Sequence, residues 1–184
     1  MSGGHMQKAV DDLALVLERV KGKQLRAFRD EILASRRVFV TGLGRTGLMA
    51  RGFAMRLMHL GRRVYHVGDV ITPAIAKGDL LVICSRTGKS KVLRHYVNIA
   101  RQAKARVALV TARPDGPVGE RAHCVVHIDD SVAREGKRPR ERQQPLGSLF
   151  EQSLLIVLDQ VVLDLMDQLD LTEDDMARSH TEFE

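Results

Sequence analysis

The feature that most constrains the fold of this chain is a short β-forming stretch that runs directly into a glycine-rich turn. Residues 38–47 read VFVTGLGRTG, which places Gly42, Gly44 and Gly47 in a Gly-x-Gly-x-x-Gly pattern ahead of a stretch with helical spacing. In such a strand–turn–helix unit, the backbone N–H groups at the start of the helix can bind a phosphate. The pattern leaves three ligands open: the pyrophosphate of a dinucleotide, a nucleoside triphosphate, or a phosphorylated sugar.

Strands and helices alternate along the middle of the chain. The expected strands are 37–40, 63–67, 79–84, 106–111 and 124–128, and the expected helices are 46–60, 90–104, 147–169 and 171–179, preceded by two helices within 6–35. The strand 79–84 (DLLVIC) is nearly all apolar, as strands covered on both faces are. The sequence therefore predicts an α/β fold, with an open parallel five-stranded sheet flanked by helices on both faces in a Rossmann-like three-layer sandwich. The helix at 147–169 is apolar nearly all round, so we expect it in the core or at an interface with another subunit.

Composition limits the class of partner. The 184 residues carry a net charge of +6, which suits anionic partners such as phosphorylated metabolites. Aromatic residues make up 4% and Trp is absent, which argues against a stacking platform for single-stranded nucleic acid. No stretch approaches the roughly 18 apolar residues that span a bilayer, and we interpret Cys84 and Cys124 as reduced, buried thiols. We therefore expect a cytoplasmic protein without nucleic-acid or membrane partners, in which residues 1–5 are a cloning scar, residues 6–184 form one domain and the polar run 134–144 is a solvated loop.

A second candidate phosphate turn, SRTGKS, follows the expected strand 79–84. Its residues predicted to bind the anion are Ser85, Arg86, Thr87, Gly88, Lys89 and Ser90. The closing Gly-Lys-Ser suggests a P-loop, but the first glycine of that motif would fall on Ile83. What remains is a hydroxyl-rich helix N-terminus, where free N–H groups and the helix dipole favour an anion. The structural alternative is that Thr87 or Ser90 only caps the helix.

The two turns should open on the same edge of the sheet, because ligands of parallel α/β sheets bind at the carboxyl ends of the strands. One pocket would hold a phosphate at the second turn, with Arg45 and Thr46 of the first turn beside the rest of the molecule. An acid that could hold a ribose, Asp69, comes late for a dinucleotide site. Ser148-x-x-Glu151 predicts a capping box, in which Ser148 caps a helix and Glu151 bonds back. The functional alternative is that Glu151 faces the pocket as a general base.

Together, GLGRTG, FAMRLMHLG, TPAIAKGDLLVICSRTGKS, QPLGSLFEQ and a histidine near the C-terminus resemble the 6-phospho-3-hexuloisomerase family, which has a single SIS (sugar isomerase) domain. The resemblance implies an intramolecular oxidoreductase that interconverts 3-hexulose 6-phosphate and fructose 6-phosphate through an enediolate. It implies a place in the ribulose monophosphate pathway of formaldehyde assimilation. It also implies a homotetramer that uses no cofactor and no metal.

The resemblance also assigns roles to single residues. Glu151 falls on the catalytic base of the family, and His180 falls on a C-terminal histidine that resembles a catalytic group donated across subunits. The phosphate turn of the family is usually Ser-Gly-Ser-Gly-x-Thr, so Arg86 replaces a glycine, and Glu182 replaces the asparagine of the usual His-x-Asn-x-Glu ending. The change at Arg86 keeps a second function open, a non-catalytic SIS module that senses a sugar phosphate. A nicotinamide oxidoreductase is less favoured, because no convincing ribose-binding acid accompanies the glycines.

Overall fold

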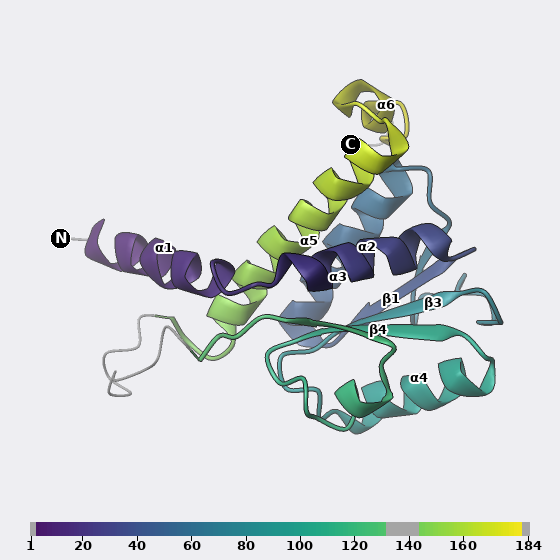
Figure 1. Ribbon diagram of the computed structural model, residues 1–184, viewed down its shortest axis with the longest axis horizontal. Helices are drawn as coiled ribbons and strands as arrows, with labels where there is room; N and C mark the ends of the chain where they lie inside the picture. The colour runs from purple at the N-terminus through teal and green to yellow at the C-terminus, as the bar shows by residue number, and fades with distance from the viewer. Residues whose placement is uncertain (1–2, 132–143, 182–184) are drawn as a thin grey trace.

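A parallel five-stranded sheet forms the middle layer of the protein (Figure 1). The computed structural model describes residues 3–131 and 144–181. Its strands are β1 (Val38–Gly42), β2 (Val64–His66), β3 (Leu80–Cys84), β4 (Arg106–Thr111) and β5 (Cys124–His127). They lie in the order β2-β1-β3-β4-β5, and every neighbouring pair is parallel, so all five strands end at the same edge. The sheet confirms the fold class predicted from the sequence.

Helices cover both faces of the sheet. They are α1 (Gly3–Leu17), α2 (Gly22–Ala34), α3 (Gly44–His59), α4 (Lys91–Gln102), α5 (Ser148–Leu169) and α6 (Glu173–Ala177), with a 3₁₀ helix at Gly119–Arg121. Figure 1 shows α4 on one side of the sheet and α2, α3 and α5 on the other. Side chains alternate across β1, so that Val38 and Val40 join the apolar cluster of α2, α3 and α5, whereas Phe39 joins that of α4. In the central strands β1, β3 and β4 both faces are buried, which is why these strands read as nearly unbroken apolar runs.

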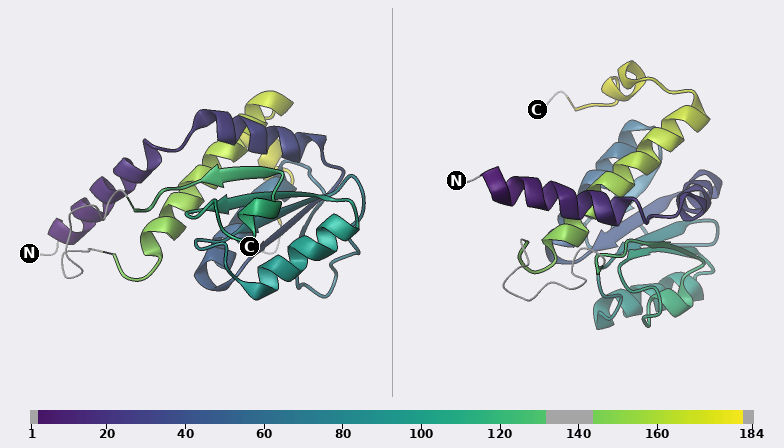
Figure 2. Two further views of the ribbon diagram at one scale, coloured as in Figure 1. Left: turned by 60° about the horizontal axis from the view of Figure 1, so that its bottom comes forward. Right: turned by 60° about the vertical axis from the view of Figure 1, so that its left-hand side comes forward.

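Helix α5 belongs to the core on one side and is exposed on the other. Phe150 and Leu154 are fully buried, while Leu155, Ile156 and Leu163 are between 40% and 55% exposed. Helix α1 packs along α5 and reaches beyond the sheet (Figure 2). The apolar helix predicted for the core or for an interface is therefore a core element that also presents an apolar stripe outward.

A buried carboxylate, Asp79, fastens the amino edge of the sheet. Its side chain is 0% exposed. The Arg37 guanidinium donates to both of its oxygens, from Nε at 3.1 Å and from Nη2 at 2.6 Å, and the backbone N–H of Ala76 donates to Oδ2 at 2.8 Å. Arg36 adds a contact at 3.3 Å. These bonds tie the connection before β3 to the start of β1.

The ends of some elements differ from those predicted. β1 continues to Gly42 instead of stopping at residue 40, because Thr41 and Gly42 still pair with Ile83 and Cys84 of β3. The 3₁₀ helix lies in a stretch for which the sequence predicted no element. The central alternation of strands and helices agrees with the prediction, because it depends on apolar periodicity and not on the terminal residues of each element.

Three further expectations concern the surface and the cysteines. Cys84 and Cys124 are free, buried thiols, as predicted. Within residues 3–131 and 144–181, no helix has the length and apolarity needed to cross a membrane. Nearly all of the predicted solvated loop 134–144, and the departure at Glu182, lie outside the described residues.

Candidate active site

The first glycine-rich turn joins β1 to α3 through a very close backbone contact. A Cβ atom on Gly47 would lie 2.6 Å from the carbonyl oxygen of Gly42, closer than packed atoms allow. Gly44 has a φ of +56°, a conformation that favours glycine. The glycine pattern is therefore required by the path of the backbone, whichever phosphate the turn serves. Arg45 projects from the first turn of α3, directly beyond the end of β1.

The second turn, residues 85–90, joins β3 to α4 and is shaped by its own hydroxyl groups. Ser85 Oγ accepts from the N–H of Gly88 at 3.2 Å, and Thr87 Oγ1 accepts from the N–H of Lys89 at 3.4 Å. Ser90 is the N-cap of α4 and accepts from the N–H of Leu93 at 3.4 Å. The capping role considered for Ser90 is therefore present. Ser85 is buried, whereas Thr87 and Lys89 are exposed at the helix N-terminus, where an anion is favoured.

The start of α5 supplies the third part of the site, and here the predicted capping box is wrong. Gly147 is the N-cap and Ser148 is the first helical residue, so the Ser148 side chain sits one position too late to cap the helix. Its Oγ accepts instead from Arg45 Nη1 at 3.1 Å. The Glu151 carboxylate pairs with Arg45, with 3.2 Å between Oε2 and Nε, and its side chain is only 14% exposed. Glu151 therefore faces the first turn, as the functional alternative requires.

The three parts meet where the strand order reverses. β1 and β3 are neighbours, but the chain leaves them toward opposite faces, α3 packing on one and α4 on the other. Open α/β sheets bind ligands in the crevice at such a point. The Cβ position of Gly147 lies 3.4 Å from Arg86 Cδ and 3.6 Å from Glu151 Oε1, so Arg86 and Glu151 flank the same point. These residues at the carboxyl ends of β1 and β3, called the crevice below, thus combine a shielded carboxylate with two guanidinium groups and a helix N-terminus, a set able to bind an anion and move a proton.

Sequence reasoning missed two residues that lie beside this crevice. Asp130, completely buried, accepts from Arg86 Nε at 2.5 Å, and Arg113 Nη1 lies 3.7 Å from its other oxygen. Both residues follow the ends of strands, Arg113 after β4 and Asp130 after β5. The rule that the carboxyl ends of parallel strands share one edge would have indicated them. Cys84, the last residue of β3, takes no part in this chemistry, because burial raises the pKa of its thiol to about 12.

Two predicted site residues are placed less favourably. Thr46 is buried in the first turn of α3, with 8% of its surface exposed. His180 is not in the crevice of its own chain: its ring lies 5.2 Å from that of His59, the last residue of α3. At about 1.5 Å of rise per residue, α3 separates His59 from Arg45 by roughly 20 Å. Figure 1 accordingly shows α6 and the C-terminal segment at the end of α5 remote from the sheet.

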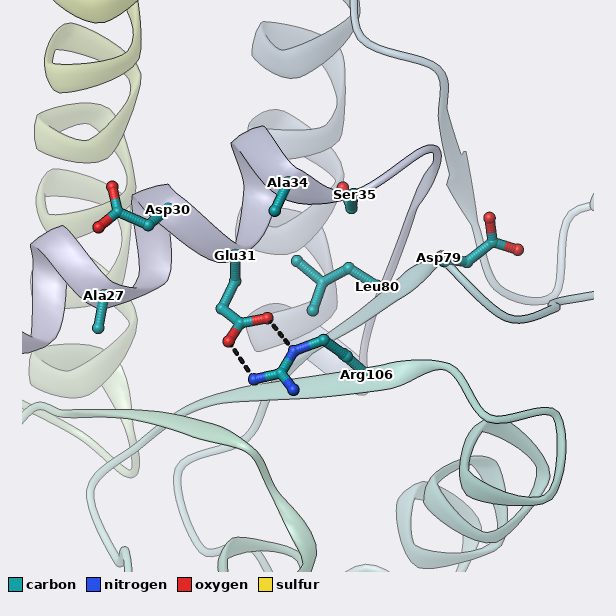
Figure 3. Close-up of a pocket in the computed structure, with 9 residues that line it drawn as sticks. Ala27, Asp30, Glu31, Ala34, Ser35, Asp79, Leu80 and Arg106 are labelled. Atoms are coloured by element: carbon teal, nitrogen blue, oxygen red, sulfur yellow. Dashed lines mark hydrogen bonds and ion pairs between the residues drawn. The ribbon is translucent and has the colours of Figure 1, made fainter.

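A cavity of about 460 Å³ lies at the opposite, amino edge of the sheet (Figure 3). It is lined by Ala27, Asp30, Glu31, Ala34, Ser35, Gly78, Asp79, Leu80 and Arg106. Its charged groups are engaged in holding the fold, because Glu31 pairs with Arg106 across it and Asp79 is bound by Arg37. The candidate site is therefore the group of residues at the carboxyl edge and not this cavity.

The nucleotide alternative finds little support in the geometry. The carboxylate considered for a ribose, Asp69, is paired with Arg51 at 2.8 Å and lies 3.6 Å from His66. In the part of the chain that the structure describes, no three His, Cys, Asp or Glu side chains are grouped so that they could hold a metal ion.

The chain is similar to a known domain family, to proteins of known name and to solved structures. Residues 31–136 match the SIS domain model. The 3-hexulose-6-phosphate isomerase of Bacillus subtilis (strain 168) is 37% identical over 165 residues, which cover 90% of this chain and 89% of that protein. The 3-hexulose-6-phosphate isomerase of Mycobacterium gastri is 36% identical over 174 residues, 95% of this chain and 87% of that protein. A Methanococcus jannaschii protein, whose crystal structure was taken to infer the function of a 3-hexulose-6-phosphate isomerase, superposes with a TM-score of 0.84 at 28% identity, covering 97% of this chain and 98% of that one.

Proposed function

Because the chain belongs to the SIS-domain family and, within it, to the 3-hexulose-6-phosphate isomerases, we propose that it interconverts 3-hexulose 6-phosphate and fructose 6-phosphate. It is a sugar-phosphate isomerase, an enzyme that moves a carbonyl group along a phosphorylated sugar. The alternative of a non-catalytic SIS module that senses a sugar phosphate is less supported, because relatives named as isomerases match nearly the whole chain.

The observation that carries the proposal is the position of the Glu151 carboxylate. It lies in the first turn of α5, is largely shielded from water and faces Arg45 at 3.2 Å instead of bonding back to its own helix. The phosphate turn at 85–90 contributes Arg86 to the other side of Gly147. A sugar whose phosphate binds at this turn would extend its carbon chain toward Glu151.

The proposed reaction moves the carbonyl group from C3 to C2 of the sugar. A base removes the proton from C2 of the 3-hexulose, the 2,3-enediolate forms, and a proton is delivered to C3. We assign the proton transfer to Glu151. Arg45, already paired with this carboxylate, is assigned to the negative charge that develops on the enediolate oxygen. Lys89 and the N-terminus of α4 favour the phosphate dianion. Thr46 and the hydroxyls of the second turn complete the proposed binding set.

Replacement of Glu151 by Gln tests this proposal. The amide keeps the shape of the side chain and can still accept from Arg45, but it cannot remove a proton. We expect the isomerisation rate to fall by about 10²–10⁴-fold, the usual contribution of a general base, with sugar-phosphate binding nearly intact. The measurement is NMR of fructose 6-phosphate in heavy water, following deuterium at C3 and the appearance of 3-hexulose 6-phosphate.

Asp164→Asn is the matched control, because Asp164 is an acid on the same helix whose side chain accepts from Gln160. It should leave the rate unchanged. An active Glu151→Gln protein with a lowered melting temperature would show that Glu151 is only structural. A wild-type protein that binds fructose 6-phosphate but yields neither product nor exchange would instead be a sensor.

The proposal extends to assembly and cellular role. We place the enzyme in the cytoplasm, in the ribulose monophosphate pathway of formaldehyde assimilation, as a homotetramer. Exposed apolar side chains on neighbouring helices support assembly, among them Leu48 and Met58 on α3 and Leu163 on α5. His180 lies far from the crevice of its own chain, so a catalytic role for it requires the crevice of a neighbouring subunit.

A further inference from the structure

A buried carboxylate that the proposed reaction does not use lies beneath the phosphate turn. Asp130 is 0% exposed and follows β5. One of its oxygens accepts from Arg86 Nε at 2.5 Å, and the other lies 3.7 Å from Arg113 Nη1. Arg86 follows β3 and Arg113 follows β4, so this one carboxylate joins the ends of three adjacent strands.

The backbone of the phosphate turn is held from the same side. The carbonyl oxygen of Arg86 accepts from the N–H of Ala112 at 3.2 Å, and that of Gly88 accepts from the N–H of Val118 at 3.3 Å. A Cβ on Gly116 would lie 3.3 Å from the carbonyl oxygen of Thr87. These contacts fix the peptide groups of the turn, but not the direction of the Arg86 side chain. That direction depends on Asp130.

Asp130 engages only part of the Arg86 guanidinium. Nε is bonded to the carboxylate, and among residues 3–131 and 144–181 no hydrogen-bond acceptor is found for the two terminal nitrogens. The side chain is 28% exposed, with its Cδ beside Gly147 at the start of α5. A guanidinium held at Nε and open at both terminal nitrogens presents two parallel donors, the geometry that binds a phosphate bidentately.

We propose that Asp130 is a positioning residue for phosphate binding, which holds Arg86 so that its terminal nitrogens contact the phosphate bound at residues 85–90. This inference rests on the proposed function, since it takes the phosphate of the sugar as the ligand of the turn. Without the carboxylate, the long Arg86 side chain would be free to adopt other rotamers and would lose entropy on binding. Buried partners of this kind orient the groups that contact a ligand.

Asp130→Asn tests the inference through binding of inorganic phosphate, measured by isothermal titration calorimetry. We expect the dissociation constant to rise about tenfold, because a charge-assisted contact is no longer held in place. The KM for the sugar phosphate should rise by a similar factor while kcat changes less than about threefold, because the phosphate is bound equally in ground and transition states. Asp129→Asn is the control, since that neighbouring acid accepts from Ser131 Oγ and should alter neither constant.

A double-mutant cycle with Arg86→Gln separates positioning from a general effect on the fold. Asp130→Asn should have little further effect on phosphate affinity once Arg86 is Gln, whereas independent, additive losses would overturn the inference. If Asp130→Asn does not fold, Arg86→Gln alone must weaken phosphate binding about tenfold. Unchanged phosphate affinity in either single variant also overturns it. The titration needs no turnover, so it separates this inference from the proposed reaction. If the wild type does not isomerise the sugar phosphate but the Asp130 and Arg86 variants lose phosphate affinity as expected, the proposed reaction is refuted and the role of Asp130 stands.

Discussion

Replacing Asp79 by Asn should strongly lower the free energy of unfolding without altering the residues of the crevice, which lie at the opposite edge of the sheet. The Asp79 side chain is 0% exposed and accepts three close hydrogen bonds, two from Arg37 and one from the backbone of Ala76. Breaking a buried ion pair costs about 3–5 kcal/mol. We expect the lower end, about 3 kcal/mol, because Arg37 is 16% exposed and can recover part of its hydration. For a chain of this length, that corresponds to a fall of about 6–12 °C in melting temperature.

The effect should depend on pH in a defined direction. Burial opposes the charge on Asp79, but the hydrogen bonds from Arg37 and Ala76 outweigh it and lower the pKa below its usual 3.8. The stabilisation by the ionised carboxylate is therefore complete well above the unfolded pKa and is lost as the pH falls through the folded pKa. The difference between wild type and Asp79→Asn should be full at pH 7 and should shrink below about pH 4.

Urea unfolding at a series of pH values, followed by circular dichroism, measures this difference. Asp30→Asn is a matched control, because Asp30 lines the same cavity (Figure 3) but its side chain is 62% exposed. It should change the free energy of unfolding by less than about 0.5 kcal/mol. A loss below about 1 kcal/mol for Asp79→Asn at pH 7, or a difference that grows on acidification, would refute the reasoning.

Two further predictions concern histidines. Burial, followed by the charges of Arg106 and Arg101, lowers the pKa of His123, whose Nδ1 accepts from the N–H of Val107 at 2.9 Å. The free energy of unfolding should therefore fall as the pH drops through about 6.5, and it should fall less in His123→Asn. Urea midpoints that change equally with pH in the wild type and in His123→Asn would contradict this prediction. If His180 serves a neighbouring crevice, inactive Glu151→Gln and His180→Asn proteins refolded together should regain about a quarter of wild-type activity, from sites with both native residues. No recovery would refute the donation of His180 to a neighbouring subunit.

The sequence was sufficient to predict the sheet and the edge at which the two turns of the candidate site meet. Apolar periodicity identified each strand, and the two turns after β1 and β3 identified the crevice, because both features depend on residues close together in the chain. The orientation of Glu151 was left between two interpretations. It depends on whether the N-cap of α5 is residue 147 or residue 148, and local patterns leave helix ends uncertain by one or two residues.

Other parts of the site depend on contacts that no local pattern shows. Arg86 and Asp130 are 44 residues apart, and their ion pair exists only because β3, β4 and β5 end side by side. Arg45 and Ser148 are 103 residues apart and meet because α3 and α5 pack together. The role proposed for His180 depends on contacts between subunits, since within a single chain His180 lies beside His59 and not beside Glu151.

The contact between Gly42 and Gly47 also sets the rotational phase of helix α3. An α-helix turns by about 100° per residue, so one residue inserted between Arg45 and Gly47, with the contact to Gly42 kept, would carry the guanidinium of Arg45 roughly a quarter of the way around the helix. It would then point away from the carboxylate of α5. The close contact of the two glycines fixes the rotation of α3 about its axis, so two residues without side chains determine the direction in which Arg45 points.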